Sequence, residues 1–240
     1  MKPRLSRRGT IASKRATTSA PASSFSGRIV TMRPQGTTAP DQTSGALAVT
    51  TEQFTNVNFR MDVSTIQQLR TGSDPNNWET VWVVWDYEPQ TNEIGWQTHF
   101  YYVALKIDGV EVGKEDPAYL GAQRFLFTAG APDSPVGSVH RIEVSETNGA
   151  GFTTFTVKYD GVEVTTFTDE ERPYTGGSVG FYSEDSKVAI DNLVVSGTTG
   201  NPINENFDSF PLQTITTDLT TIGPLQFVFL GYGEAKVEQV

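Results

Sequence analysis

The sequence predicts an all-β protein, a sandwich or barrel of antiparallel strands. Roughly a dozen short segments are rich in Val, Ile, Thr and aromatic residues, and Gly, Pro, Asn or Asp bounds each of them. Two Asp-Gly pairs, Asp108-Gly109 and Asp160-Gly161, indicate tight hairpins, because a type I′ turn needs positive φ at both central residues. No stretch longer than about ten residues has a convincing helical period, although a short helix at Ser64–Arg70 is an alternative to a loop there.

Composition allows one large β domain and excludes several kinds of site. The chain has 240 residues, of which 37% are hydrophobic and 11% aromatic, enough for a substantial core. It has no cysteine, so neither a disulfide nor a thiolate metal site can form. The 2 histidines are too few for a His-rich zinc site.

Charge is distributed unevenly along the chain. The net charge is -10, yet every charged residue before Asp41 is basic: Lys2, Arg4, Arg7, Arg8, Lys14, Arg15, Arg28 and Arg33. From Asp41 onward 28 acidic residues outnumber 10 basic ones, which gives that part a net charge of -18. Such a body would repel nucleic acid, whereas the basic segment could bind phosphate, an acidic surface or a neighbouring copy of the protein.

Residues 1–27 are predicted to be a flexible basic arm, since they are rich in Ser, Thr and Ala and poor in apolar residues. They lack the apolar core of a secretory signal, and they fit either a transit peptide or an arm that orders on assembly. No apolar run reaches the roughly 18 residues of a membrane span, so we expect none.

The stretch Trp78–Lys114 organises the predicted fold and holds all four tryptophans. Within it, Thr80–Tyr87 and Gln97–Ile107 are apolar on both faces, which is typical of central strands with material above and below. We therefore expect Trp82 and Phe100 to be buried.

The remaining strands are expected on both sides of this stretch. Residues 28–50 are expected to supply an edge strand, and Thr55–Val63 alternates like a half-buried strand. Simple alternation places Tyr87 on the same face as Trp85. Six more strands are expected at Phe125–Thr128, His140–Ser145, Thr153–Tyr159, Val162–Phe167, Ser178–Ser183 and Val188–Val195.

Three segments carry a family likeness: WETVWVVWDYEP (Trp78–Pro89), YYVALKIDGVEVGKEDPAYLGAQRFLFT (Tyr101–Thr128) and YTGGSVGFYSEDSKVAIDNLVV (Tyr174–Val195). Together they resemble the concanavalin A-like lectin/glucanase superfamily, in particular its laminin-G-like and keto-disaccharide-hydrolase-like modules. The resemblance implies a two-sheet antiparallel β-sandwich, a concanavalin A-like jelly roll. We therefore expect the flexible arm at 1–27, the jelly roll at 28–197, and a C-terminal β extension at 198–240 that completes this sandwich or a neighbouring one.

Most proteins that the chain resembles bind glycans or proteins, and a minority are hydrolases or lyases. The carboxylate pattern of the glucanases, Glu-x-Asp-x-(x)-Glu, is absent. Asp86 and Glu88 would share a face, but Pro89 follows at once and no third acid precedes them. We therefore expect no catalytic residue and no enzyme.

The expected function is a glycan-binding or recognition module that works outside the cell or on a cell or virion surface. A structural assembly subunit, such as a virion decoration, fibre or filament protein, is an alternative in which the arm and the C-terminal extension join copies into a homo-oligomer. A glycoside hydrolase is a less favoured alternative.

Aromatic faces and polar groups at the ends of the central strands form the expected ligand site. Sugar C–H groups could stack on the aromatic faces while carboxylates and amides bond hydroxyls. The residues expected to do this are Trp78, Asp86, Glu88, Asn92 and Trp96.

The resemblance also implies a structural calcium ion where the first and last strands meet. Its expected ligands are Asp191, Glu205 and Asp208, since calcium prefers carboxylate oxygens. The alternative is that Asp191 caps a turn while Glu205 and Asp208 are solvated.

Overall fold

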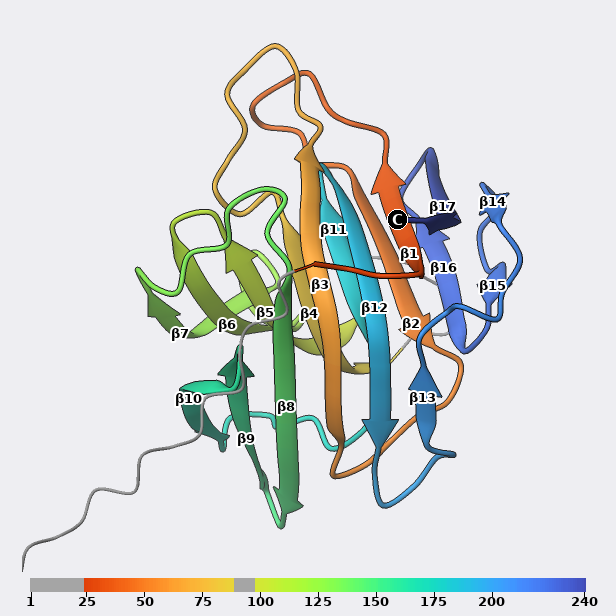
Figure 1. Ribbon diagram of the computed structural model, residues 1–240. Coiled ribbons are helices and arrows are strands. Elements are labelled where there is room, and N and C mark those ends of the chain that lie inside the picture. Colours follow the sequence, from red (N-terminus) through yellow and green to blue (C-terminus); the bar gives the residue numbers. More distant parts are fainter. Residues whose placement is uncertain (1–23, 89–97) are drawn as a thin grey trace, which may run out of the picture.

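The computed structural model describes residues 24–88 and 98–240, and in these two ranges it contains seventeen strands and no helix. The strands form two antiparallel sheets packed face to face, as Figure 1 shows. The predicted two-sheet antiparallel sandwich is therefore confirmed. Across the described residues, no helix has the length and apolar character needed to span a membrane.

Sheet A has nine strands, with β13 attached beside β12. In spatial order they are β10 (Val162–Asp169), β9 (Phe152–Tyr159), β8 (His140–Gly149), β3 (Asn58–Gln68), β12 (Ser186–Ser196), β1 (Arg28–Pro34), β17 (Gly233–Gln239) and β14 (Gln213–Ile215), and β13 is Ile203–Glu205. Sheet B has eight strands: β15 (Thr221–Ile222), β16 (Leu225–Phe229), β2 (Gly45–Thr50), β11 (Ser178–Glu184), β4 (Val81–Glu88), β5 (His99–Lys106), β6 (Gly109–Glu115) and β7 (Gln123–Ala129).

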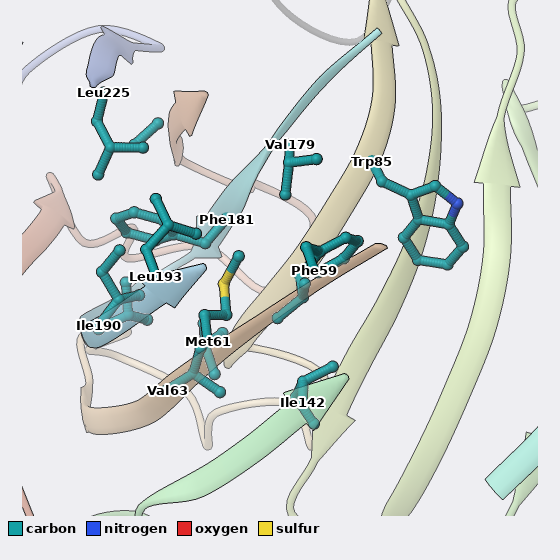
Figure 2. Close-up of a cluster of buried hydrophobic side chains, with 14 of the residues drawn as sticks. Phe59, Met61, Val63, Trp85, Ile142, Val179, Phe181, Ile190, Leu193 and Leu225 are labelled. Atoms are coloured by element: carbon teal, nitrogen blue, oxygen red, sulfur yellow. The ribbon is translucent and has the colours of Figure 1, made fainter. Parts of the chain in front are cut away.

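The main core lies between the sheets, where alternate side chains of every long strand point inward. Figure 2 shows Phe59, Met61 and Val63 of β3 lying opposite Val179 and Phe181 of β11. All of them are almost fully buried. Truncating such a phenylalanine to alanine costs about 3–5 kcal/mol, so this layer holds the two sheets together.

A second apolar cluster lies on the outer face of sheet B. It includes Trp82 and Val84 of β4 with Phe100 and Tyr102 of β5. The expectation that Trp82 and Phe100 are buried is thus confirmed, since each exposes less than a tenth of its surface. This outer cluster explains why the central strands are apolar on both faces.

A β-bulge interrupts β4 at Asp86, whose φ of 53° is left-handed. Trp85 pairs with Tyr101, but the next paired residue of β4 is Glu88, opposite His99. The extra residue reverses the alternation, because a bulge leaves one residue unpaired. The expectation that Tyr87 shares a face with Trp85 is therefore wrong, and Tyr87 joins the outer cluster instead.

The segment Ser64–Arg70 forms no helix, because β3 continues through it to Gln68. Along this segment β3 pairs with β12, whereas its pairing with β8 ends at Val63. The Thr65 hydroxyl also accepts the backbone N–H of Val81, which links β3 to the start of β4. Pairing with β12 and burial of this β-branched residue override the weak helical pattern.

The C-terminal residues pair with the N-terminal strands of the same chain. β17 pairs with β1 and β16 pairs with β2, so the C-terminal extension contributes to both sheets. The expectation that residues 28–50 supply an edge strand is therefore wrong. Both β1 and β2 lie inside their sheets because the last strands of the chain cover them.

The two Asp-Gly hairpins differ by one residue in register. In the second, Tyr159 pairs with Val162, and Asp160 and Gly161 both have positive φ, as a type I′ turn requires. In the first, Lys106 pairs with Gly109, so the turn is centred one residue earlier and the expected type I′ turn is wrong there. Nearly identical heptads therefore adopt different registers according to which side chains the core buries.

Candidate ligand-binding groove

A groove of about 560 Å³ lies on the outer face of sheet B. Its walls come from β4, β5, β6, β7 and β11 and from the segments that precede β2, β4 and β7. The lining residues are Thr43, Trp78, Trp82, Lys106, Glu111, Glu115, Gly121, Ala122, Gln123, Phe125 and Glu184.

Aromatic side chains form part of the groove. Trp82 stacks on Tyr102, with ring centroids 4.7 Å apart, and meets the edge of Tyr182 at 5.5 Å. Trp78 is 45% exposed because it lies in the turn before β4, and Phe125 of β7 is 60% exposed. The groove therefore has a rigid, buried aromatic floor and two aromatic side chains open to solvent.

The position of Trp78 is fixed by its backbone. Its carbonyl oxygen accepts a hydrogen bond of 2.9 Å from the indole N–H of Trp82 and another from the backbone N–H of Thr80. These bonds satisfy a buried donor of the floor and hold the exposed ring at the mouth of the groove.

Two buried carboxyls lie in the groove. Glu115 has the same side-chain orientation as Glu111, because both alternate with the inward-facing Val110 and Val112 of β6. Burial, together with the charges of Glu184 and Glu111, raises the pKa of Glu115 to about 9. Burial and the nearby Glu79 and Asp185 raise the pKa of Glu184 to about 8. Near neutral pH both groups are protonated, so each can donate as well as accept a hydrogen bond.

Other polar groups in the groove are held in a chain of contacts. The Tyr102 hydroxyl donates to Glu111 Oε1 at 2.9 Å and accepts from the side-chain amide of Gln123 at 2.7 Å. Lys106 Nζ lies 3.9 Å from Glu111 Oε2. Hydrogen-bond donors and acceptors therefore surround the aromatic floor in fixed positions, an arrangement suited to a ligand with many hydroxyls.

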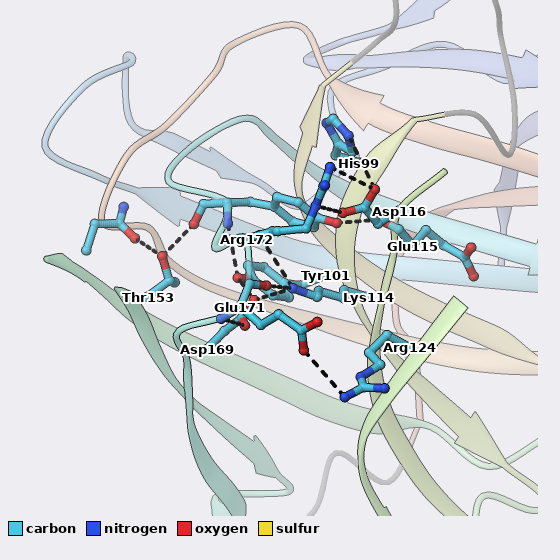
Figure 3. Close-up of polar contacts among 12 residues, drawn as sticks. His99, Tyr101, Lys114, Glu115, Asp116, Arg124, Thr153, Asp169, Glu171 and Arg172 are labelled. Atoms are coloured by element: carbon cyan, nitrogen blue, oxygen red, sulfur yellow. Dashed lines mark hydrogen bonds and ion pairs between the residues drawn. The ribbon is translucent and has the colours of Figure 1, made fainter. Parts of the chain in front are cut away.

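A buried ion pair supports β6 from the opposite face. Figure 3 shows Lys114 directed toward Asp169, while the neighbouring Glu115 points the other way. Lys114 Nζ lies 2.7 Å from Asp169 Oδ2, and the Tyr101 hydroxyl donates to the same oxygen at 2.7 Å. Lys114 also donates to the backbone carbonyl of Glu171. These contacts tie β6 to the segment after β10 and so fix the position of Glu115.

The residues that were expected to form one ligand site do not lie in one place. Trp78 lines the groove, whereas Asp86 and Glu88 line a second pocket of about 390 Å³ with His99 and Arg172. Asn92 and Trp96 lie outside the described residues.

Asp86 was expected to be open to a ligand, but the structure buries it. The bulge turns it inward, and it is only 1% exposed. Its burial and the adjacent Glu146 carboxyl raise the pKa of Asp86 well above its usual value. Burial raises the pKa of Glu146 as well, and two neighbouring buried carboxyls cannot both be charged at low cost.

The three residues expected to bind calcium lie in one region but are each held separately. Glu205 accepts the backbone N–H of Phe207 at 2.7 Å, and Asp208 accepts that of Arg28 at 2.8 Å. Burial raises the pKa of Asp191 to about 6, helped by Asp62, Asp208 and Glu205. Within 24–88 and 98–240 no group of three or more His, Asp or Glu side chains is arranged to hold a metal ion. Calcium binding stays a prediction.

Several groove residues were not anticipated from the sequence. Alternation along Gly109–Glu115 places Glu111 and Glu115 opposite two core valines, which was a usable signal. The contribution of Glu184 had no local signal, because β11 lies beside β4 although the two strands are far apart in the sequence.

Comparisons with known proteins give a likeness in fold alone. No family model and no curated protein matches the sequence. Among solved structures, the Emp47p carbohydrate recognition domain is 9% identical, over 80% of this chain and 100% of that chain, with a TM-score of 0.42. A glycoside hydrolase family 16 endo-glucanase from Bacteroides ovatus is 13% identical, over 88% and 94%, with a TM-score of 0.37.

A tail fiber protein from an E. coli phage is 14% identical, over 64% of this chain and 16% of that chain, with a TM-score of 0.33. Likenesses this distant say nothing about the ligand or the activity of this protein. The two sheets described above form the two-sheet antiparallel β-sandwich that the resemblance implied.

Proposed function

We propose that the protein is a non-enzymatic recognition module whose groove on the outer face of sheet B binds a glycan. The observation that carries this proposal is the exposed indole of Trp78 at the mouth of a groove with a rigid aromatic floor. Sugars present apolar C–H faces between hydroxyls, so they need both an aromatic surface and nearby polar groups.

The polar groups of the groove favour a neutral glycan over an acidic one. The carboxyls of Glu115 and Glu184 are protonated near neutral pH and can donate to sugar hydroxyls. An anionic ligand would meet Glu111 and a body whose net charge from Asp41 onward is -18. We therefore expect the ligand to be an uncharged oligosaccharide.

The same carboxyls support a binding role over a hydrolytic one. Hydrolysis of a glycosidic bond needs one protonated carboxyl and one ionised carboxyl on opposite sides of the bond. Glu115 and Glu184 both keep their protons near neutral pH, which leaves Glu111 as the only other carboxyl that lines the groove among the described residues. Glu111 is already engaged by the Tyr102 hydroxyl and Lys106.

A glycan array followed by titration calorimetry tests the proposal. For a glycan that binds, Trp78→Ala should weaken affinity by about 30-fold, because an aromatic hot spot contributes about 2 kcal/mol. The matched control is Phe152→Ala, which removes an aromatic ring of similar exposure (38%) on β9, outside the groove. Failure to bind any glycan, or equal losses in the two variants, would refute the groove as a glycan site. Release of reducing ends that disappears in Glu115→Gln would refute the non-enzymatic role.

A further inference from the structure

A chain of two hydrogen bonds joins Ser138, His140 and Asp160, far from the groove. The distance from Ser138 Oγ to His140 Nε2 is 2.6 Å, and that from His140 Nδ1 to Asp160 Oδ2 is 2.9 Å. These contacts lie within the range at which a serine nucleophile, a histidine base and an orienting carboxylate act together.

The local sequence explains why the three side chains meet. Ser138 closes the turn that begins at Pro135, since its backbone N–H donates to the Pro135 carbonyl, and His140 opens β8 two residues later, so the two side chains are close enough to bond. Asp160 begins the two-residue turn of the β9–β10 hairpin, where an aspartate tolerates its left-handed φ of 50°. Pairing of Ile142 with Tyr159 aligns β8 and β9 and carries that turn beside His140.

The carboxylate and the imidazole are both held in one orientation. Asp160 Oδ1 accepts the backbone N–H of Arg141 at 2.8 Å, and the Asp160 N–H donates to the Arg141 carbonyl at 2.8 Å. The His140 ring packs against Tyr159, with centroids 4.7 Å apart. Asp160 Oδ2 is thereby left to face His140 Nδ1.

These contacts also select the tautomer of His140. A carboxylate can only accept a hydrogen bond, so the proton of the neutral imidazole is on Nδ1. Nε2 then carries the lone pair, and it faces the Ser138 hydroxyl. That hydroxyl donates to the Pro135 carbonyl at 2.5 Å, so its single proton must turn from that carbonyl to Nε2 before His140 can take it.

We propose that Ser138 is a nucleophile toward small activated carboxylic esters, with His140 as its general base and Asp160 as a positioning residue. The side chains of His140 and Asp160 are 14% and 18% exposed, and Ser138 is half-buried, so a small reagent can reach the hydroxyl. This activity is independent of the proposed glycan site, since none of the three residues lines the groove.

The chemistry balances with an ester and water alone. A bond forms between Ser138 Oγ and the acyl carbon as the hydroxyl proton passes to His140 Nε2. The bond from the acyl carbon to the leaving alcohol breaks, and that alcohol takes the proton from Nε2. Water then attacks the acyl-serine with the same base and releases the carboxylic acid and Ser138.

The alternative is a structural latch that pins the loop before β8 to the β9–β10 hairpin. A latch would leave the serine as unreactive as any other hydroxyl, so chemical reactivity separates the two roles. A fluorophosphonate probe is suitable, because attack by serine breaks its P–F bond, forms an Oγ–P bond, and releases fluoride while the proton moves to His140.

The experiment treats the full-length protein with the probe and locates the adduct by peptide mass spectrometry. We expect an adduct on Ser138 that is absent from Ser138→Ala. His140→Gln and Asp160→Asn should each slow labelling by roughly a hundredfold, the usual contribution of a general base. Hydrolysis of p-nitrophenyl acetate should fall in parallel.

Ser196→Ala is the matched control, because it removes an exposed serine hydroxyl at the end of β12 with no histidine bonded to it. Thermal midpoints recorded for every variant distinguish a loss of reactivity from a loss of folding. The proposal is overturned if no adduct forms on Ser138, or if folded His140→Gln is labelled as fast as the wild type.

Discussion

Replacing Glu115 by glutamine should stabilise the protein at alkaline pH and change little at acid pH. Glu115 is buried in the groove, and its pKa is raised to about 9, chiefly by burial and then by the charges of Glu184 and Glu111. An unfolded chain ionises the same carboxyl near its ordinary value of 4.5. The folded protein must therefore either keep the proton or bury a charge as pH rises.

The sign follows from counting protons. Between pH 4.5 and about 9 the folded state keeps the Glu115 proton and the unfolded state has lost it. The free energy of unfolding then falls as pH rises through this window, by up to about 1.4 kcal/mol per pH unit. The rise in pKa from 4.5 to about 9 corresponds to a loss of about 6 kcal/mol in the free energy of unfolding. A local opening of the groove lets water reach the carboxylate and makes the loss smaller, so we expect a loss of at least about 2 kcal/mol. Glutamine cannot ionise, so Glu115→Gln removes this loss.

Urea denaturation of the two proteins at pH 5, 7 and 9 measures the effect. The two free energies of unfolding should nearly coincide at pH 5 and differ by about 2 kcal/mol or more at pH 9, with the variant more stable. Glu170→Gln is the control, since Glu170 is exposed after β10, and its curve should run parallel to the wild type. The reasoning fails if the wild-type stability is flat or rises from pH 5 to pH 9 and the Glu115→Gln curve runs parallel to it. Glu115 would then not be a buried neutral acid.

Two further predictions concern other charged side chains. Lys114→Met should destabilise the protein by about 3–5 kcal/mol in urea denaturation, because it leaves Asp169 buried without its partner, and Asp169→Asn in the same chain should recover much of the loss. If Asp191, Glu205 and Asp208 bind calcium, the ion should raise the thermal midpoint at pH 7, Asp208→Asn should abolish the rise, and the effect should vanish below about pH 6, where Asp191 is protonated. An unchanged midpoint with and without chelator would remove calcium.

The layered architecture was predictable because it depends on short-range patterns. Alternation and turn residues mark most strands, and the two-sided apolar pattern of β4 correctly indicated burial of Trp82. The predictions were wrong where pairing between strands far apart in the sequence determines the position of a strand. Only the pairing of β16 and β17 shows that β1 and β2 lie inside their sheets. The register of the first Asp-Gly hairpin likewise follows from burial of Leu105 and Val110, which pair in the core.

The groove was predictable only in part for the same reason. Trp78 was expected at the end of a central strand and open to a ligand, and it is 45% exposed in the turn before β4. The opposite wall comes from β6 and β7, and Glu184 comes from the far end of β11. β4 to β7 pair in chain order, so adjacency along the sequence already brings β6 and β7 to this surface, whereas β11 lies beside β4 only through a connection between distant parts of the chain.

The bulge at Asp86 explains why residues close together in the sequence do not form the expected ligand site. The extended run from Val81 to Asp86 spans about 17 Å, so Trp78 and Asp86 lie toward opposite ends of β4. The bulge then turns Asp86 into the space between the sheets, beside Glu146, while Tyr87 faces outward with Trp82. One strand thus contributes an aromatic surface to the groove at one end and a buried acid pair at the other. Substituting Asp86 should therefore alter the pH dependence of stability, whereas glycan affinity should depend on Trp78.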